Sequence, residues 1–179
     1  RATQFDVFQF EGSGFNSVVS GQGELLNVKQ NFDFILADLP LALPIVEASF
    51  DKAIKARGNW LMLLYLLRKL EEGGKLVAVL EPSFLTGGPA AKFREMLANE
   101  GLFLQAAFNP PANILAPHAS VRPVVCVFSH KKRDNVFLGE ISEDNHETLV
   151  SNFTNENSTN YLTQGIIQPI NGFSSFAAL

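Results

Sequence analysis

The feature that most constrains this chain is a short apolar run that ends in a carboxylate and a proline. Residues Phe32 to Ala37 are apolar except for Asp33, and Asp38-Leu39-Pro40-Leu41 follows directly. A bounded apolar run of this length predicts a strand that is buried on both faces of a parallel sheet. Open α/β sheets bind their ligands at the carboxyl ends of such strands. The sequence therefore makes Asp38 a candidate site residue.

The residues after this strand continue an α/β pattern. We expect a helix over about 44–55 and a second over Asn59 to Glu71, with Asn59 as its amino-terminal cap and Gly73-Gly74 as its end. The second helix is apolar nearly all round through Leu67, so it should pack deep against the sheet. Lys75 to Leu80 then reads as the next strand, with its carboxyl end at Glu81-Pro82-Ser83.

Three more strands are predicted downstream. A helix that begins near Pro89 leads to a strand at Leu102 to Phe108. Pro123 to Ser129 follows through the loop Asn109 to Arg122 without an intervening helix, so these two strands should be antiparallel. Val136 to Ile141 is expected at an edge of the sheet. We therefore expect a mostly parallel sheet with one antiparallel strand near its edge.

Length and charge limit the organisation of the chain. Its 179 residues, 46% of them hydrophobic, suffice for one well-packed domain. We expect an uncertain partial strand region over 1–31, an α/β core over 32–141 and a C-terminal extension leading out of the domain over 142–179. Lys and Arg total 14 against 18 Asp and Glu, a net charge of -4. Because this provides no basic footprint, DNA binding is expected only within a larger assembly.

The remaining composition excludes several classes of protein. The single cysteine, Cys126, lies in an apolar run and is expected to be a buried small hydrophobe. The longest purely apolar run, Trp60 to Leu67, falls far short of the ~18 residues of a membrane span. No signal peptide is recognisable, so we expect a cytoplasmic protein without membrane contact. No spacing of His, Cys and acidic residues predicts a metal site.

The order of these segments resembles the adenine-specific DNA methyltransferases of restriction-modification systems, and most of all the DNA methylase subunit of type I systems. The resemblance covers roughly Phe32 to Lys132 and includes Asp38-Leu39-Pro40-Leu41, the Gly73-Gly74 turn and Pro82-Ser83-Phe84-Leu85. It implies an α/β, class I S-adenosylmethionine-dependent methyltransferase-like (Rossmann-like) fold with a mostly parallel sheet, incomplete at the amino terminus. It also implies methyl transfer to the amine of adenine.

In that family the strand ends in Asp, Asn or Ser, followed by two prolines and an aromatic residue. The resemblance makes Asp38 and the carbonyl of Leu39 acceptors for the amine of a flipped-out adenine, with Pro40 as the second proline. Leu41 stands where the family has an aromatic residue. Without the ring, a stacking interaction worth roughly 1–3 kcal/mol per base is lost. Asp38 also has a simpler interpretation, as a cap of the following turn.

A second loop matches a later part of the family pattern. Asn109-Pro110-Pro111-Ala112 looks like the catalytic tetrapeptide, but its position indicates a loop at the ligand edge of the sheet. We expect Pro110, Pro111, His118 and Arg122 to form a substrate loop. The basic run His130-Lys131-Lys132-Arg133 either contacts phosphates or is a solvated cluster at the end of a strand.

The methyl donor has no clear binding turn in this sequence. Gly12-Ser13-Gly14 superficially matches the family's glycine turn but lies too close to the strand that ends at Asp38. S-adenosylmethionine is therefore implied only if a glycine turn exists upstream, and additional domains or subunits are expected. Two functions stay open: part of a longer DNA methyltransferase, or a noncatalytic scaffold or interaction module that retains only the fold.

Overall fold

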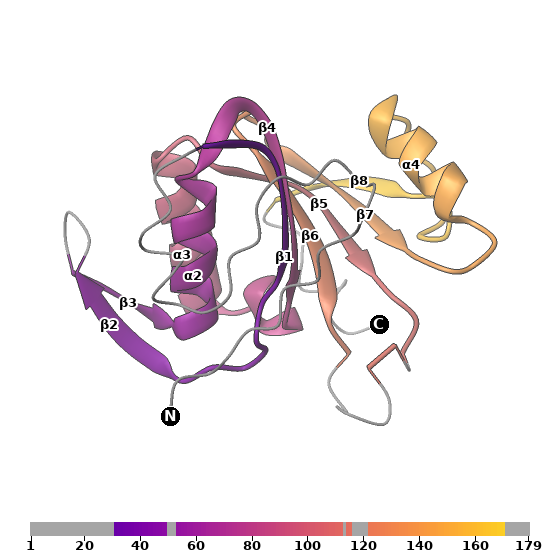
Figure 1. The fold of residues 1–179 in the computed structure, drawn as a ribbon. Helices are drawn as coiled ribbons and strands as arrows, with labels where there is room; N and C mark the ends of the chain where they lie inside the picture. Colours follow the sequence, from indigo (N-terminus) through magenta and orange to yellow (C-terminus); the bar gives the residue numbers. More distant parts are fainter. Residues whose placement is uncertain (1–30, 50–52, 113, 116–121, 171–179) are drawn as a thin grey trace, which may run out of the picture. The chain divides into compact units, whose positions relative to one another are not determined.

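A six-stranded sheet and a separate two-stranded hairpin form the framework of the chain (Figure 1). The structure is a computed structural model that describes residues 31–49, 53–112, 114–115 and 122–170. In chain order the elements are β1 (Phe32–Asp38), β2 (Ile45–Ser49), β3 (Ala53–Arg57), α2 (Gly58–Leu67), β4 (Leu70–Leu80), the 3-10 helix η1 (Pro82–Phe84), α3 (Gly88–Asn99), β5 (Phe103–Asn109), β6 (Val124–Ser129), β7 (Asn135–Glu140), α4 (His146–Thr154) and β8 (Ile166–Pro169).

The large sheet has the strand order β1-β4-β6-β5-β7-β8. β1 is parallel to β4 and β5 is parallel to β7, whereas β6 is antiparallel to both β4 and β5. The strands β1, β4, β5 and β7 therefore run in one direction, and β6 and β8 run in the other. The expected mostly parallel α/β sheet and the antiparallel pairing of β5 with β6 are both confirmed. The expectation of one antiparallel strand near the edge is wrong, because β6 lies inside the sheet and β8 is a second such strand. The edge position predicted for residues 136–141 is wrong, because β7 lies between β5 and β8.

Burial of β1 differs from the prediction. Ile35 and Ala37 are buried, but Phe34 and Leu36 on the other face are 41% and 55% exposed. Successive side chains of a strand point to opposite faces, so one face of β1 packs and the other does not. The expectation of a strand buried on both faces is therefore wrong, although its position in the chain is confirmed.

The helix expected over 44–55 is also wrong, because this segment contains the hairpin of β2 and β3. Val46 pairs with Ala56 across the hairpin and Glu47 pairs with Lys55, so opposite charges face each other in neighbouring strands. The β-branched residues Ile45 and Val46 favour this extended conformation. Ile54 and Ala56 are buried, which gives the hairpin one packed face.

The predicted second helix is present, but its ends differ. α2 ends at Leu67 with Arg68 as its C-cap, and Gly73-Gly74 lies inside β4. The β1–β4 register shifts here, from Phe32 opposite Leu70 to Phe34 opposite Lys75. A Cβ at Gly74 would lie 2.9 Å from the carbonyl oxygen of Asp33, so the glycine permits close contact of the two strands. Its role is in the sheet rather than at the end of the helix.

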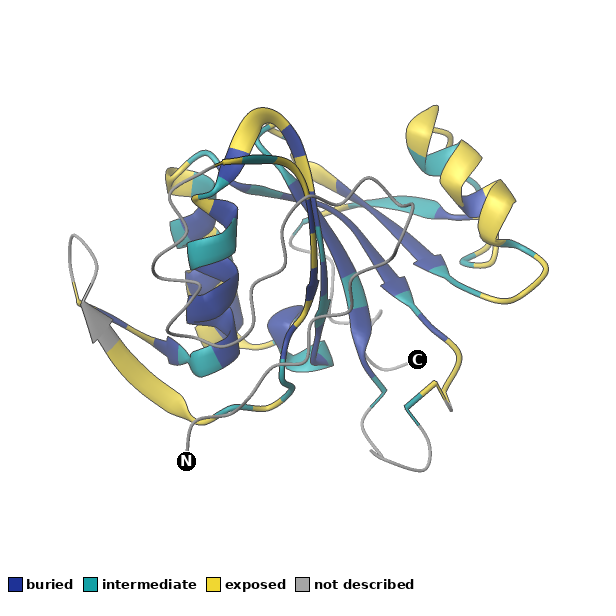
Figure 2. Cartoon of the chain, in the orientation of Figure 1, coloured by how far each residue is buried: buried dark blue, intermediate teal, exposed yellow. Residues whose placement is uncertain are grey.

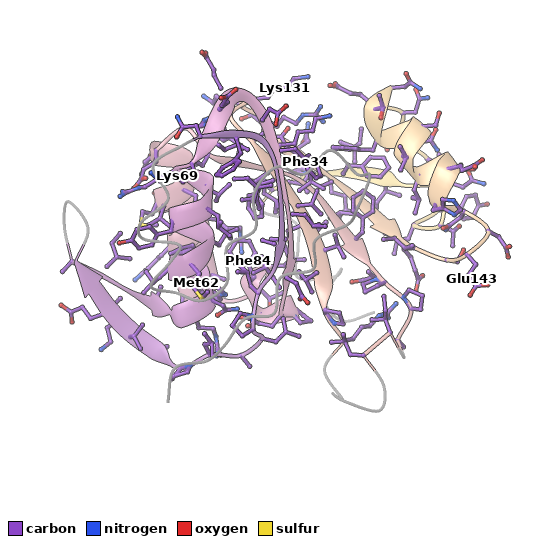
Figure 3. All side chains as sticks on the ribbon, in the orientation of Figure 1. Phe34, Met62, Lys69, Phe84, Lys131 and Glu143 are labelled. Atoms are coloured by element: carbon purple, nitrogen blue, oxygen red, sulfur yellow. The ribbon has the colours of Figure 1, made fainter. Side chains whose placement is uncertain are left out.

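α2 and α3 lie on the same side of the sheet (Figure 1), and an aromatic cluster fills the space beneath them. The ring of Phe84 lies 5.6 Å from Trp60, 6.4 Å from Phe93 and 5.8 Å from Phe128, mostly edge to face. Figure 3 shows Phe84 between α2 and the sheet. Cys126 is fully buried, as expected, and burial raises the pKa of its thiol well above the ordinary value. Most of α2, on this side of the sheet, is buried, whereas α4 is mostly exposed (Figure 2).

The other face of the sheet packs against α4. Leu149 joins Phe108 and Phe137 in a second cluster, and Phe153 packs beside them. Gly139 permits this contact, since a Cβ there would lie 2.9 Å from both Leu149 and Phe108. Residues 146–169 thus return to the same sheet, where β8 pairs with β7. Within the described part of the chain, no helix has the length and apolar character needed to cross a membrane.

We predict that Leu64→Ala lowers the free energy of unfolding by ~2–5 kcal/mol, because Leu64 is fully buried and its removal leaves a cavity. Denaturant melts of the two proteins measure the difference. Val150→Ala on α4 is the control: its side chain is 62% exposed, so the change should stay within about 0.5 kcal/mol. A loss at Leu64 no larger than that of the control would contradict the packing described for α2.

Candidate functional site

The carboxyl ends of β1, β4, β5 and β7 meet at one edge of the sheet because these strands run in the same direction. Asp38 ends β1 opposite Val79 of β4, and Glu81 follows directly after β4. Asn109 at the end of β5 pairs with Glu140 at the end of β7. The edge therefore gathers polar side chains from four strands, in the place where α/β sheets bind ligands.

Asp38 has the properties of an available acceptor. Its side chain is exposed, while Ala37 before it and Leu39 after it are buried and hold the backbone in place. Among the residues that the structure describes, Asp38 makes no side-chain hydrogen bond and no ion pair, so the turn-capping role considered from the sequence is not observed. Pro40 and Leu41 are half-buried beside it. The tetrapeptide thus lies at the ligand edge with its carboxylate open to solvent.

The chain leaves this tetrapeptide through a strained turn. Ala42 has a φ of +56°, in the left-handed region that residues with a Cβ rarely occupy. Two hydrogen bonds hold the residues that follow. The Arg57 guanidinium donates to the carbonyl of Leu43 at 3.2 Å, and the Gly58 N–H donates to the carbonyl of Pro44 at 3.0 Å. The loop after the candidate site is therefore fixed to the start of α2.

The sequence did not reveal the role of a buried charged group at this edge, the carboxylate of Glu81. Glu81 is 4% exposed and accepts hydrogen bonds from Nδ2 of Asn59 at 2.5 Å and from Nε1 of Trp60 at 2.7 Å. The predicted cap role of Asn59 is wrong, because Arg57 occupies the cap position and the Asn59 side chain points to Glu81. The only sequence signal was an acidic residue directly after a buried strand, the same signal that Asp38 gives.

The second predicted loop is joined to the end of the sheet by Arg122. Its Nε donates to the carbonyl of Pro110 at 3.1 Å, and a terminal nitrogen lies 2.9 Å from a carboxylate oxygen of Glu140. Pro110 is buried and Pro111 is exposed, whereas His118 lies outside the described residues. Arg122 therefore links β5, β6 and β7 at the ligand edge. Any contact of this loop with a substrate remains a prediction.

The basic run His130-Lys131-Lys132-Arg133 lies at the opposite edge of the sheet, since it follows the antiparallel strand β6. The side-chain nitrogens of Lys131 and Arg133 lie 2.8 Å and 2.6 Å from the same carboxylate oxygen of Glu156. The hydrogen bond from Lys131, together with the charge of Arg133, lowers the pKa of Glu156. The run is thus partly neutralised and is separated from Asp38.

The described residues contain no group of three His, Cys, Asp or Glu side chains that would suit a metal ion. The glycine turn considered for S-adenosylmethionine, Gly12-Ser13-Gly14, falls outside the described part of the chain. What this edge offers is a set of acceptor oxygens, which suits an amine.

The fold is similar to those of solved methyltransferases. The methyltransferase subunit of a type I restriction-modification system from Streptococcus thermophilus matches with a TM-score of 0.65 and 18% identity, over 83% of this chain and 36% of that one. A modification subunit of a putative type I restriction enzyme from Vibrio vulnificus matches with a TM-score of 0.59 and 16% identity, over 81% and 35% of the two chains. A putative class I S-adenosylmethionine-dependent methyltransferase from Listeria monocytogenes gives 0.58 and 15%, over 77% and 47%.

These similarities concern the fold, and they confirm the expected class I methyltransferase-like α/β architecture. The chain spans between 35% and 47% of the length of these three proteins. No family model matches the chain, and no curated protein matches it.

We predict that Ala42→Gly stabilises the chain by about 1 kcal/mol, because glycine adopts the left-handed conformation without the steric cost that a Cβ imposes. Denaturant melts again provide the measurement. The matched control is Ala91→Gly at an exposed position of α3, where the same substitution should destabilise by roughly 0.5–1 kcal/mol. Loss of stability at both positions would argue against a left-handed residue at 42.

Proposed function

We propose that this chain is a methyltransferase-like part of a longer S-adenosylmethionine-dependent DNA adenine methyltransferase, and that the loop Asp38-Leu39-Pro40-Leu41 receives the amine of the target adenine. One observation carries the proposal. Asp38 presents an exposed carboxylate, with no partner among the described residues, at the carboxyl end of a strand in a class I methyltransferase-like sheet. This is the ligand edge of such folds.

The chemistry assigned to the loop is the binding of an amine. The exocyclic N–H groups of a flipped-out adenine would donate to the Asp38 carboxylate and to the Leu39 carbonyl. A negative acceptor there stabilises positive charge that develops on the nitrogen when it acts as a nucleophile. S-adenosylmethionine would supply the methyl group, and the part of this loop is to hold the amine in place.

The proposal includes partners as well as the reaction. A net charge of -4 argues against independent binding to DNA, so DNA would be bound by further domains or subunits. Several proteins with a similar fold are subunits of type I restriction-modification systems, which is consistent with a multisubunit assembly. The proposal places this assembly in the cytoplasm.

A second candidate function, a noncatalytic scaffold or interaction module, is favoured by the composition of the same loop. Leu41 offers no aromatic ring to stack on a base, and Leu39 stands in place of a proline. Loss of the ring alone removes roughly 1–3 kcal/mol of base binding. The two functions differ in whether the loop still binds adenine, and this is open to measurement.

The 179-residue chain is predicted to bind S-adenosylmethionine weakly or not at all, because its sequence contains no clear form of the glycine turn that holds this cofactor in the family it resembles. Isothermal titration calorimetry of the chain with the cofactor is the direct measurement. A micromolar dissociation constant would contradict this prediction and would redirect attention to Gly12-Ser13-Gly14.

In the full-length protein, Asp38→Ala should reduce methyl transfer to DNA by at least about 100-fold, since it removes the charged acceptor of the target amine. Asp38→Asn keeps an acceptor oxygen and should retain more activity. Leu41→Tyr should raise activity or adenine affinity by restoring a stacking ring, and His118→Ala should leave most of the activity. Transfer of tritium from labelled cofactor to DNA measures all four.

Two outcomes of this experiment would decide against the proposal. Unchanged methyl transfer in Asp38→Ala would show that this loop does not bind the target amine. Absence of transfer in the wild-type protein and in every variant, Leu41→Tyr included, would favour the noncatalytic scaffold.

A further inference from the structure

The buried carboxylate of Glu81 has a third neighbour besides Asn59 and Trp60. Nε of Arg57 lies 3.6 Å from Oε1 of Glu81, on a side chain that is one-third exposed. A buried carboxylate requires donors or cations around it, because its desolvation costs several kcal/mol otherwise. Arg57, Asn59 and Trp60 provide them from three nearly consecutive positions at the start of α2.

Arg57 also contacts the loop that follows the candidate site. While its Nε lies near Glu81, its terminal nitrogen NH1 donates to the carbonyl of Leu43 at 3.2 Å. The guanidinium therefore joins a buried carboxylate to the loop that follows Asp38. The planar guanidinium has several N–H groups and can contact both partners at once, whereas lysine has a single ammonium group.

The next residue strengthens this connection. Gly58 donates its N–H to the carbonyl of Pro44 at 3.0 Å, and a Cβ at this position would lie 3.2 Å from Cδ1 of Leu43. The absence of a side chain lets the loop approach the start of α2 closely. Two successive carbonyls, those of Leu43 and Pro44, are thus held by two successive residues.

The turn that these contacts hold is strained. Ala42 has a positive φ, and such a conformation persists only where the surroundings impose it. The hydrogen bonds at Leu43 and Pro44 lie directly after Ala42 and are suited to impose it. They also determine how the chain leaves Leu41.

We propose that Glu81 is a positioning residue for the candidate site: through Arg57 it fixes the conformation of the loop 39–44. The importance of Glu81 for base binding rests on the proposed function. Its effect on the conformation of the loop 39–44 does not. The competing interpretation is that Glu81 only satisfies Asn59 and Trp60 and supports α2. The two interpretations differ in whether Glu81 acts through Arg57.

Hydrogen–deuterium exchange of the 179-residue chain distinguishes them, and the Gly58 amide is the reporter because its hydrogen bond ends on the loop. Glu81→Gln and Arg57→Met should each accelerate exchange at Gly58 by at least about ten-fold, while the β4 amides of residues 76–78 stay within about two-fold of the wild type. In the double variant, Arg57→Met should add less than about two-fold to the effect of Glu81→Gln, as expected for residues that act as a pair.

Arg68→Met is the matched control, since it removes the exposed Arg68–Glu100 pair at the other end of α2 and should leave the loop unchanged. Unchanged exchange at Gly58 in Arg57→Met would overturn the proposal, and this variant decides the matter if Glu81→Gln does not fold. Equal acceleration at Gly58 and in β4, or independent effects of the two substitutions, would overturn it too. Because no reaction is measured, failure of the proposed methyl transfer leaves this result intact.

Discussion

The parallel pairing of β1 with β4 requires the chain to cross back along the sheet between these strands, and α2 provides the crossover. α2 can do so because it is apolar nearly all round: Leu63, Leu64 and Leu67 are fully buried against the sheet. This arrangement brings the carboxyl ends of β1 and β4 side by side. Asp38 and Glu81 therefore lie at the ends of two neighbouring strands. The candidate site thus depends on how one apolar helix packs.

Two of the acidic residues at this edge, Glu81 and Asp38, have different surroundings. Glu81 is buried, and Asn59, Trp60 and Arg57 surround its carboxylate. Asp38 is exposed and has no such partners among the described residues. A carboxylate that is already satisfied serves structure, whereas an open one is available to a ligand. At this edge, Glu81 is held by its neighbours, and Asp38 is exposed and available as an acceptor.

The sequence was sufficient for β1, the later part of β4, the strands β5, β6 and β7, and the apolar helix, because bounded apolar runs and helical periodicity are local signals. It did not reveal the hairpin of β2 and β3, since the sequence of this segment has no period that separates a helix from two short strands. It also misplaced Gly73-Gly74, where the reason for glycine is a close contact with Asp33 of another strand. Such contacts exist only after the sheet has formed.

The same distinction applies to the candidate site. Asp38 stands out locally, as a carboxylate after an apolar run, and the sequence identified it. The roles of Arg57, Asn59 and Glu81 depend on contacts between residues more than twenty positions apart, which no local pattern contains. Arg122 likewise meets its two partners, Pro110 and Glu140, only once the sheet has formed.

The central claim is that Asp38 accepts the amine of adenine, and nuclear magnetic resonance titration of the isotope-labelled chain tests it most directly. Adenosine should shift the amide signals of residues 38–43, and purine riboside, which lacks the amine, should not. The shifts should disappear in Asp38→Ala and grow in Leu41→Tyr. Equal shifts with both nucleosides, or shifts that persist in Asp38→Ala, would contradict the account.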